Sequence, residues 1–200
     1  MKIGLFGGTF DPPHLGHLIV AQDVFHSLSL DRLLFLPAAA PPHKRHRPVT
    51  APTLRLEMLR AAIGDDPRFG IEEIELRRAG PSYTVDTLEE LAARAPDAEL
   101  FFLLGEDQFR DLATWRSPDR VARLARMVVL SRDGADISRL MPDFSHQPLA
   151  VTRVDLSSTE VRERVRTGRP IRYLVPAAVE ALIMKKRLYR DEQTPIHPEY

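Results

Sequence analysis

The chain has 200 residues, of which 44% are hydrophobic and 28% charged, and its 28 basic and 28 acidic side chains give a formal net charge of zero. These values are typical of a globular protein and exclude a general electrostatic attraction to nucleic acid or acidic membranes. The chain contains no cysteine, which excludes disulfides, thiolate catalysis and cysteine-ligated zinc. No signal segment and no apolar run of ~20 residues is present, so we expect a cytoplasmic protein.

The first half of the chain alternates short apolar segments with helical patterns. We expect strands at Lys2–Phe6, Arg32–Leu36 and Phe69–Leu76, and helices at His14–Ser27, Thr53–Ile63 and Thr84–Arg94. A strand, a helix and a second strand in succession predict a right-handed parallel crossover. Residues 37–52 contain several prolines and the basic run HKRHR, and a long irregular loop of this kind is often functional.

The second half continues the alternation and then becomes helical. We expect strands at Glu99–Leu104, Met127–Leu130 and Leu149–Val154, and helices at Gln108–Ala113, Ser117–Ala125, Ser158–Arg166 and Pro176–Lys186. We therefore predict one domain over residues 1–200, with a helical C-terminal part from about residue 157 and a loose tail at 190–200. The fold class is α/β: a Rossmann-like, doubly wound, mainly parallel open sheet with helices on both faces. Ligands of such sheets bind where the strands end.

A glycine- and histidine-containing loop follows the first expected strand, where residues 7–17 read GGTFDPPHLGH. The spacing fits neither a Walker A loop nor a dinucleotide fingerprint. Gly7 and Gly8 nevertheless allow the backbone to approach a ligand, and the loop leads to a helix N-terminus that favours anions. His14 and His17 lie on one side of the first helical turn. The pattern is compatible with phosphate binding, with a structural pair of histidines, or with a zinc site that lacks a third ligand.

A second helix start has a similar character, where residues 155–162 read DLSSTEVR after another expected strand. Ser158 or Thr159 is expected to cap the helix, and Arg162 lies on the side of the capping hydroxyls. Alone, this segment is better explained as an ordinary cap beside a solvated arginine. Two such helix starts, each after a strand, together favour a phosphate-binding site.

These two motifs resemble the signatures of the HxGH nucleotidyltransferase superfamily, and the chain is similar to its bacterial nicotinate mononucleotide adenylyltransferases. Further matches are PPHK at 41–44, SYTVDTL at 82–88, GED at 105–107, Trp115, Arg132 and the pair Leu188 and Tyr189. The chain departs from the family pattern at Leu156, where isoleucine is usual, and at residues 38–40, which are alanines where many relatives have a polar residue.

The resemblance implies a reaction in which the 5′-phosphate of the mononucleotide attacks the α-phosphorus of ATP and releases pyrophosphate. A phosphate monoester with a second pKa of about 6 is largely ionised at neutral pH, so no side-chain base is needed. The expected catalytic residues are His14, His17 and Arg162. Mg²⁺ is expected to arrive with ATP, without a metal ligand from the chain. The residues expected to bind ATP are Gly7, Gly8, Thr9, Phe10, His14, His17, Gly105, Asp107, Ser157, Ser158, Thr159 and Arg162.

The resemblance also implies a site for the mononucleotide, made by Thr9, Lys44, Tyr83, Thr84, Trp115 and Arg132. Trp115 would stack on the pyridinium ring, and backbone N–H groups near Tyr83 and Thr84 would bind the nicotinate carboxylate. Lys44 and Arg132 are candidates for the mononucleotide phosphate, and the loop that carries Lys44 is suited to act as a lid. A buried tryptophan and a plain helix cap are the structural alternatives.

Two other functions stay open at this point. One is a different reaction of the same superfamily, such as phosphopantetheine adenylyl transfer or cytidylyl transfer. The other is a nucleotide sensor without catalysis. In each reading the partners are small molecules, here ATP and nicotinate mononucleotide, with neither nucleic acid nor membrane, and a homo-oligomer stays open.

Overall fold

The computed structural model describes residues 1–39, 49–78, 80–131 and 144–190. Within them, six strands form one sheet in the order β3-β2-β1-β4-β5-β6, and each neighbouring pair is parallel. The strands are β1 (Lys2–Gly8), β2 (Arg32–Pro37), β3 (Phe69–Ile71), β4 (Glu99–Gly105), β5 (Arg126–Ser131) and β6 (His146–Ala150). The Rossmann-like parallel sheet is thus confirmed. Its direction of winding reverses between β1 and β4, so their carboxyl ends form the switch point.

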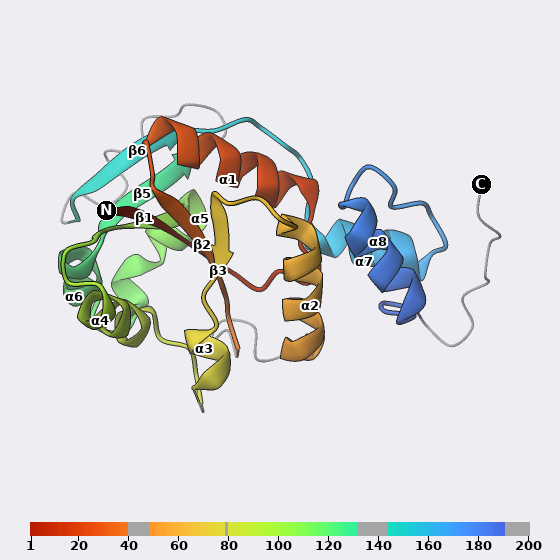
Figure 1. Ribbon diagram of the computed structural model, residues 1–200, viewed down its shortest axis with the longest axis horizontal. Coiled ribbons are helices and arrows are strands. Elements are labelled where there is room, and N and C mark those ends of the chain that lie inside the picture. Colours follow the sequence, from red (N-terminus) through yellow and green to blue (C-terminus); the bar gives the residue numbers. More distant parts are fainter. Residues whose placement is uncertain (40–48, 79, 132–143, 191–200) are drawn as a thin grey trace.

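Helices cover both faces of the sheet, as predicted (Figure 1). They are α1 (Leu15–Ser27), α2 (Pro52–Ile63), α3 (Ile74–Arg77), α4 (Thr84–Arg94), α5 (Glu106–Arg110), the 3₁₀ turn η2 (Leu112–Thr114), α6 (Pro118–Leu124), α7 (Ser158–Arg166) and α8 (Ala177–Lys185). Val24 of α1 and Leu59 of α2 pack with Phe35 on one face. Leu88 of α4 and Val121 of α6 belong to the core on the other.

Two expected strands were placed wrongly, because pairing with the neighbouring strand, and not the apolar pattern, sets their limits. We expected a strand over Phe69–Leu76, but β3 pairs with β2 only as far as Ile71, and α3 follows. We expected the last strand at Leu149–Val154. Instead, β6 begins at His146 and ends at Ala150, opposite the last residue of β5. Residues 151–154 lie beyond the end of the strand and lead to α7, and the Val151 N–H still donates to β5, at the carbonyl of Ser131.

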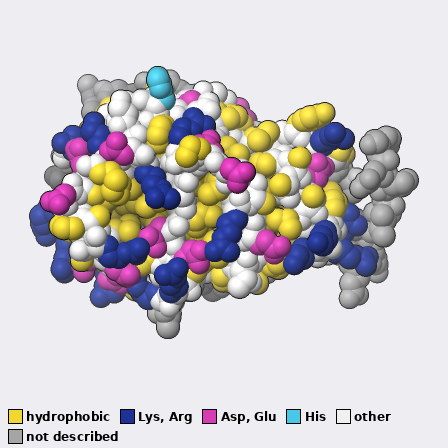
Figure 2. Space-filling model, viewed as in Figure 1, with side chains coloured by type: hydrophobic (Ala, Val, Ile, Leu, Met, Phe, Trp, Pro, Cys, Tyr) yellow, Lys and Arg dark blue, Asp and Glu magenta, His cyan; other side chains and the backbone are white. Residues whose placement is uncertain are grey.

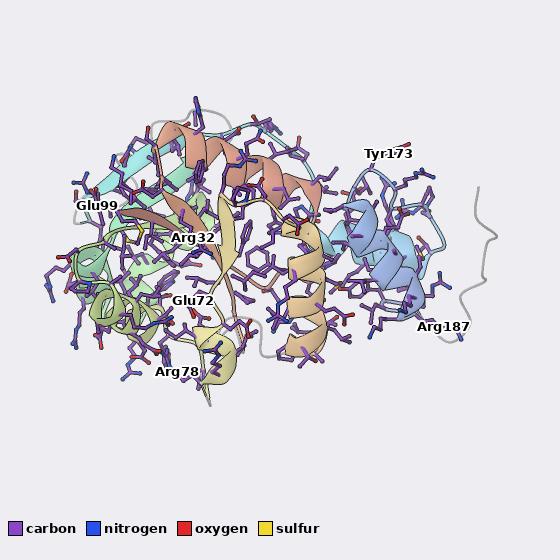
Figure 3. The ribbon with its side chains drawn as sticks, viewed as in Figure 1. Arg32, Glu72, Arg78, Glu99, Tyr173 and Arg187 are labelled. Carbon is purple, nitrogen blue, oxygen red and sulfur yellow. The ribbon has the colours of Figure 1, made fainter. Side chains whose placement is uncertain are left out.

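The two C-terminal helices lie beyond the carboxyl ends of the strands, next to α2 (Figure 1). The labelled Tyr173 and Arg187 therefore lie at the opposite end of the molecule from Glu99, which begins β4 (Figure 3). Met58 of α2 joins the apolar cluster of α7 and α8, whereas the adjacent Leu59 faces the sheet. Among the described helices, none has the length and apolarity to cross a bilayer.

Helix α2 belongs both to the core against the sheet and to the apolar cluster of α7 and α8, which supports our proposal of a single domain. We therefore expect the whole chain to unfold in one step. Met58→Ala should lower the free energy of unfolding by about 2–5 kcal/mol, because it leaves a cavity beside α7 and α8. Trp115 is the only tryptophan and lies against the sheet, so its fluorescence reports the sheet, while circular dichroism reports all helices. In urea, both signals should shift together. A shift in dichroism alone would show that the C-terminal helices form a separate unit.

Candidate nucleotide-binding site

A cleft of about 640 Å³ lies where β1, β4 and β5 end, between the loop after β1 and the starts of α1, α5 and α7. Every residue predicted to bind ATP lines this cleft: Gly7, Gly8, Thr9, Phe10, His14, His17, Gly105, Asp107, Ser157, Ser158, Thr159 and Arg162. The fold therefore brings together segments that are almost 150 positions apart in the chain. The cleft sits at the switch point, where parallel sheets bind ligands.

The two histidines form a stacked pair at the start of α1. His14 is the N-cap residue, so the helix begins one position later than we expected. The His14 and His17 rings stack with their centroids 3.7 Å apart, and the backbone N–H of His14 donates to Nδ1 of His17 at 3.1 Å. Because Nδ1 accepts this bond, the neutral His17 ring carries its proton on Nε2. His17 is thus prepared as a hydrogen-bond donor from Nε2.

Glycines make room for two rings of the loop. A Cβ at Gly8 would come within 2.7 Å of the Phe10 ring, and one at Gly16 within 3.0 Å of Nδ1 of His14. Phe10 has a left-handed backbone (φ 49°) and is buried, with its centroid 5.1 Å from that of His17. The loop thus folds its phenylalanine inward beneath the histidine and leaves backbone facing the cleft.

The start of α7 is tied to the same loop by two hydrogen bonds. Ser158 Oγ donates to the carbonyl of Pro12 at 2.8 Å, and Arg162 Nη1 donates to the carbonyl of Asp11 at 2.7 Å. Arg162 Nη2 also donates to Thr159 Oγ1 at 3.1 Å. The cap itself is Ser157, which accepts from the Glu160 N–H, and not Ser158 or Thr159 as expected. Ser158 is already the first residue of the helix, and its hydroxyl serves the loop instead.

The residues predicted for the mononucleotide are only partly in the cleft. Thr9 lines it, whereas Tyr83, Thr84 and Trp115 lie outside its lining, beside the core on the α4 side of the sheet. The Trp115 ring packs edge-on against Phe102, with centroids 6.2 Å apart. Phe102 in turn lies 3.8 Å from where a Gly7 Cβ would be. One phenylalanine thus separates the glycine loop from the tryptophan.

Tyr83 is the N-cap residue of α4, as expected, and buried polar contacts surround this helix start. Ser82 Oγ accepts the Ala39 N–H at 3.2 Å, and Thr87 Oγ1 donates to Glu75 at 3.2 Å. Burial raises the pKa of the Glu75 carboxyl, and its hydrogen bonds to Ser82 and Thr87 oppose that shift. Lys44 and Arg132, the remaining predicted residues, lie outside the described residues.

Sequence reasoning missed Arg55, the largest buried charged side chain of the site region. Its side chain is only 1% exposed and donates to the carbonyls of Thr9 at 2.7 Å, Ala38 at 2.8 Å and Thr50 at 3.0 Å. Burial lowers the pKa of Arg55, and Asp11 and Tyr189 oppose this shift. One available signal was its position three and four residues before Met58 and Leu59, which places Arg55 on the apolar face of α2.

We expect Gly8→Ala to destabilise the protein, because the methyl group would overlap the buried Phe10 ring. Overpacking of this kind typically costs about 1–3 kcal/mol in the free energy of unfolding. Gly7→Ala is the matched control, since its Cβ would meet only Phe102 at ordinary contact distance. Chemical denaturation of both variants measures the difference. Equal stability of the two would contradict the proposed packing of Phe10 over Gly8.

Comparison with known proteins agrees with this geometry. The family model described as cytidylyltransferase-like matches residues 5–164. A curated relative from Thermus thermophilus, named "Probable nicotinate-nucleotide adenylyltransferase", is 48% identical over 95% of this chain and 100% of its own. A relative of the same name from Shouchella clausii is 45% identical over 95% of this chain and 97% of its own.

Solved structures share the fold at low sequence identity. The Plasmodium falciparum nicotinic acid mononucleotide adenylyltransferase in complex with NaAD superposes with a TM-score of 0.78 at 18% identity, over 94% of this chain and 97% of that one. The complex of the same enzyme with APC gives a TM-score of 0.77 over 94% and 96%. By its family match and its full-length relatives, this chain belongs to the cytidylyltransferase-like family and, within it, to the nicotinate-nucleotide adenylyltransferases.

Proposed function

We propose that this protein transfers the adenylyl group of ATP to nicotinate mononucleotide, giving nicotinate adenine dinucleotide and pyrophosphate in NAD biosynthesis. The observation that carries the proposal is the single cleft at the switch point, where both phosphate-type helix starts meet in a chain of this family. ATP and nicotinate mononucleotide are the substrates, and the cytoplasm is the expected compartment. No residue forms a covalent intermediate in this proposal.

The chain contributes orientation and charge neutralisation to the reaction. The attacking phosphate is already ionised near pH 7, so in-line attack on the α-phosphorus needs no side-chain base. We assign His17, through Nε2–H, to the α-phosphoryl oxygens, with His14 stacked on it. Arg162 and Thr159, together with the N-terminus of α7, are assigned to the departing β- and γ-phosphates. Donors held in place before the reaction stabilise the charge that develops in the transition state.

Mg²⁺ is proposed as the companion of the ATP phosphates. The donors that line the cleft are mainly imidazole, guanidinium, hydroxyl and backbone groups, which suit phosphate oxygens. The described residues contain no group of three histidine or acidic side chains placed to hold a metal. A Mg²⁺ ion with phosphate and water ligands fits such a site, because this ion keeps several waters and does not require a protein cage. When bound, it neutralises charge on the phosphates.

The pyridine ring is assigned to the α4 side, beyond Phe102. Trp115 offers a ring face for stacking, and the N-terminus of α4 offers N–H groups and a positive dipole end to the nicotinate carboxylate. Gly7 and Thr9 line the cleft and Phe102 lies next to Gly7, so we expect a mononucleotide on the α4 side to extend its phosphate toward His17. Lys44 and Arg132 stay predictions for the mononucleotide phosphate.

We expect His17→Ala to lower kcat by ~10²–10³-fold, because it removes a preorganised donor to the reacting phosphoryl group. Pyrophosphate release from ATP, Mg²⁺ and nicotinate mononucleotide measures the effect. His26→Ala is the matched control, since His26 lies in the same helix and is exposed. If His17→Ala turned over as fast as His26→Ala, the role assigned to His17 would be wrong.

The proposed function itself is tested by the choice of acceptor. Nicotinate mononucleotide should be adenylylated much faster than nicotinamide mononucleotide, because only the acid carries a charge for the α4 N-terminus. Equal rates would keep adenylyl transfer and remove the assignment at Tyr83 and Thr84. No release with either acceptor, but release with phosphopantetheine or from CTP, would identify another reaction of the family. ATP binding without any release would identify a sensor.

A further inference from the structure

A buried polar cluster lies behind the catalytic loop and includes a residue from the far C-terminal part of the chain. It consists of Asp11, Arg55 and Tyr189. Asp11 is 4% exposed and Arg55 is 1% exposed. The charged side chains in Figure 2 are, in contrast, interspersed over the surface, where both signs are solvated. A buried charged pair is costly unless its hydrogen bonds are satisfied, so its contacts indicate what it holds.

Asp11 is the hub of this cluster. Its Oδ1 accepts the Tyr189 hydroxyl at 2.7 Å, and its Oδ2 accepts the Thr50 N–H at 3.1 Å. Its own backbone carbonyl accepts Arg162, and the next carbonyl, of Pro12, accepts Ser158. One residue thus connects the loop after β1 with the start of α2, with α7 and with the segment that follows α8.

Arg55 supports the same loop from beneath. Its guanidinium donates to the carbonyl of Thr9 in the loop after β1, and to those of Ala38 and Thr50 near the two ends of the connection between β2 and α2. These carbonyls have no place in a sheet or helix ladder, so the arginine satisfies backbone that would otherwise be buried without partners. Asp11 supplies the nearby negative charge that opposes the desolvation of Arg55.

Tyr189 completes the cluster from the end of the described chain. Burial raises the pKa of its hydroxyl, and the charge of Asp11 raises it further. The hydroxyl keeps its proton and donates it to Asp11. It is the contact by which the segment after α8 reaches the loop that carries His14 and His17.

We propose that Tyr189 is a positioning residue for adenylyl transfer. Through Asp11, its hydroxyl holds the loop after β1 in the one arrangement that presents His17 and Arg162 to the same triphosphate. Tyr189 lies outside the residues that line the cleft, so it acts through the loop and not on the substrate. This inference rests on the proposed function, and it assigns to the C-terminal helices a share in the chemistry.

Tyr189→Phe is the variant that tests this, because it removes one oxygen and keeps the ring. Tyr173→Phe is the matched control, since Tyr173 lies in the same C-terminal part and is 79% exposed. We expect Tyr189→Phe to lower kcat about 10-fold and to raise KM for ATP, because a hydrogen bond to a charged group is lost. KM for nicotinate mononucleotide should stay within about twofold of the wild type. Both variants are assayed at a temperature where circular dichroism shows them folded.

A purely structural role for Tyr189 would lower Tm and leave kcat per folded molecule unchanged, and this result would overturn the proposal. A second variant tests the route through Asp11. In the Asp11→Ala background, the further change Tyr189→Phe should have no additional effect on kcat. If the double variant instead lost kcat by the product of the two single effects, Tyr189 and Asp11 would act independently, and the proposal would also be overturned. If Asp11→Ala does not fold, the kcat and KM values of Tyr189→Phe still distinguish a positioning role from a purely structural one.

The experiment also separates this proposal from the proposed function. If the wild type releases no pyrophosphate with any acceptor, the proposed function fails, and the variants are compared by their affinity for ATP in calorimetry. Tyr189→Phe should then bind ATP about 10-fold more weakly than Tyr173→Phe. Equal affinities of these two variants would overturn the positioning role.

Discussion

The architecture of the cleft depends on the hydrogen bonds that Ser158 and Arg162 make to the carbonyls of Pro12 and Asp11. These bonds join two helix N-termini that come from opposite ends of the chain. Each helix end attracts an anion weakly on its own, because its partial charge is screened by water. Held together at the edge of one sheet, the two ends and their histidine and arginine side chains face the same cleft.

The inward packing of aromatic rings gives the loop after β1 a defined conformation, although the loop has no regular secondary structure. Phe10 packs between Phe6 and Phe35, at 5.9 and 5.5 Å between centroids, and beneath His17. Rings in edge-to-face contact restrict one another, so the imidazole above them has a defined orientation. Gly8 permits this packing, because any Cβ there would occupy the place of the Phe10 ring.

The two proposed substrate positions lie on either side of the end of β1. The ATP cleft belongs to the α1 and α7 side, and Trp115 and the start of α4 belong to the other. The loop after β2 is held from both sides of the sheet. Arg55 of α2 donates to the carbonyl of Ala38, and Ser82, which precedes α4, accepts the N–H of Ala39. A reaction that joins two nucleotides requires two such positions that face each other across a short distance.

The sequence by itself determined the alternation of strands and helices, the parallel sheet and the residues that line the cleft. These features are local: apolar runs, glycine pairs and capping residues sit next to the positions they specify. The limits of β3 and β6 depended on how far each pairs with its neighbouring strand, which no local pattern contains.

Only the tertiary structure decided which hydroxyl caps α7 and why a charged residue of α2 is buried. Ser157 is the extended residue that caps, and Ser158, inside the helix, donates to the carbonyl of Pro12. Arg55 and Tyr189 reach the loop after β1 from 46 and 178 positions away. Hydrogen bonds between residues so far apart in the chain form only when folding brings donor and acceptor together. A local sequence pattern therefore identifies the donors but does not predict their acceptors.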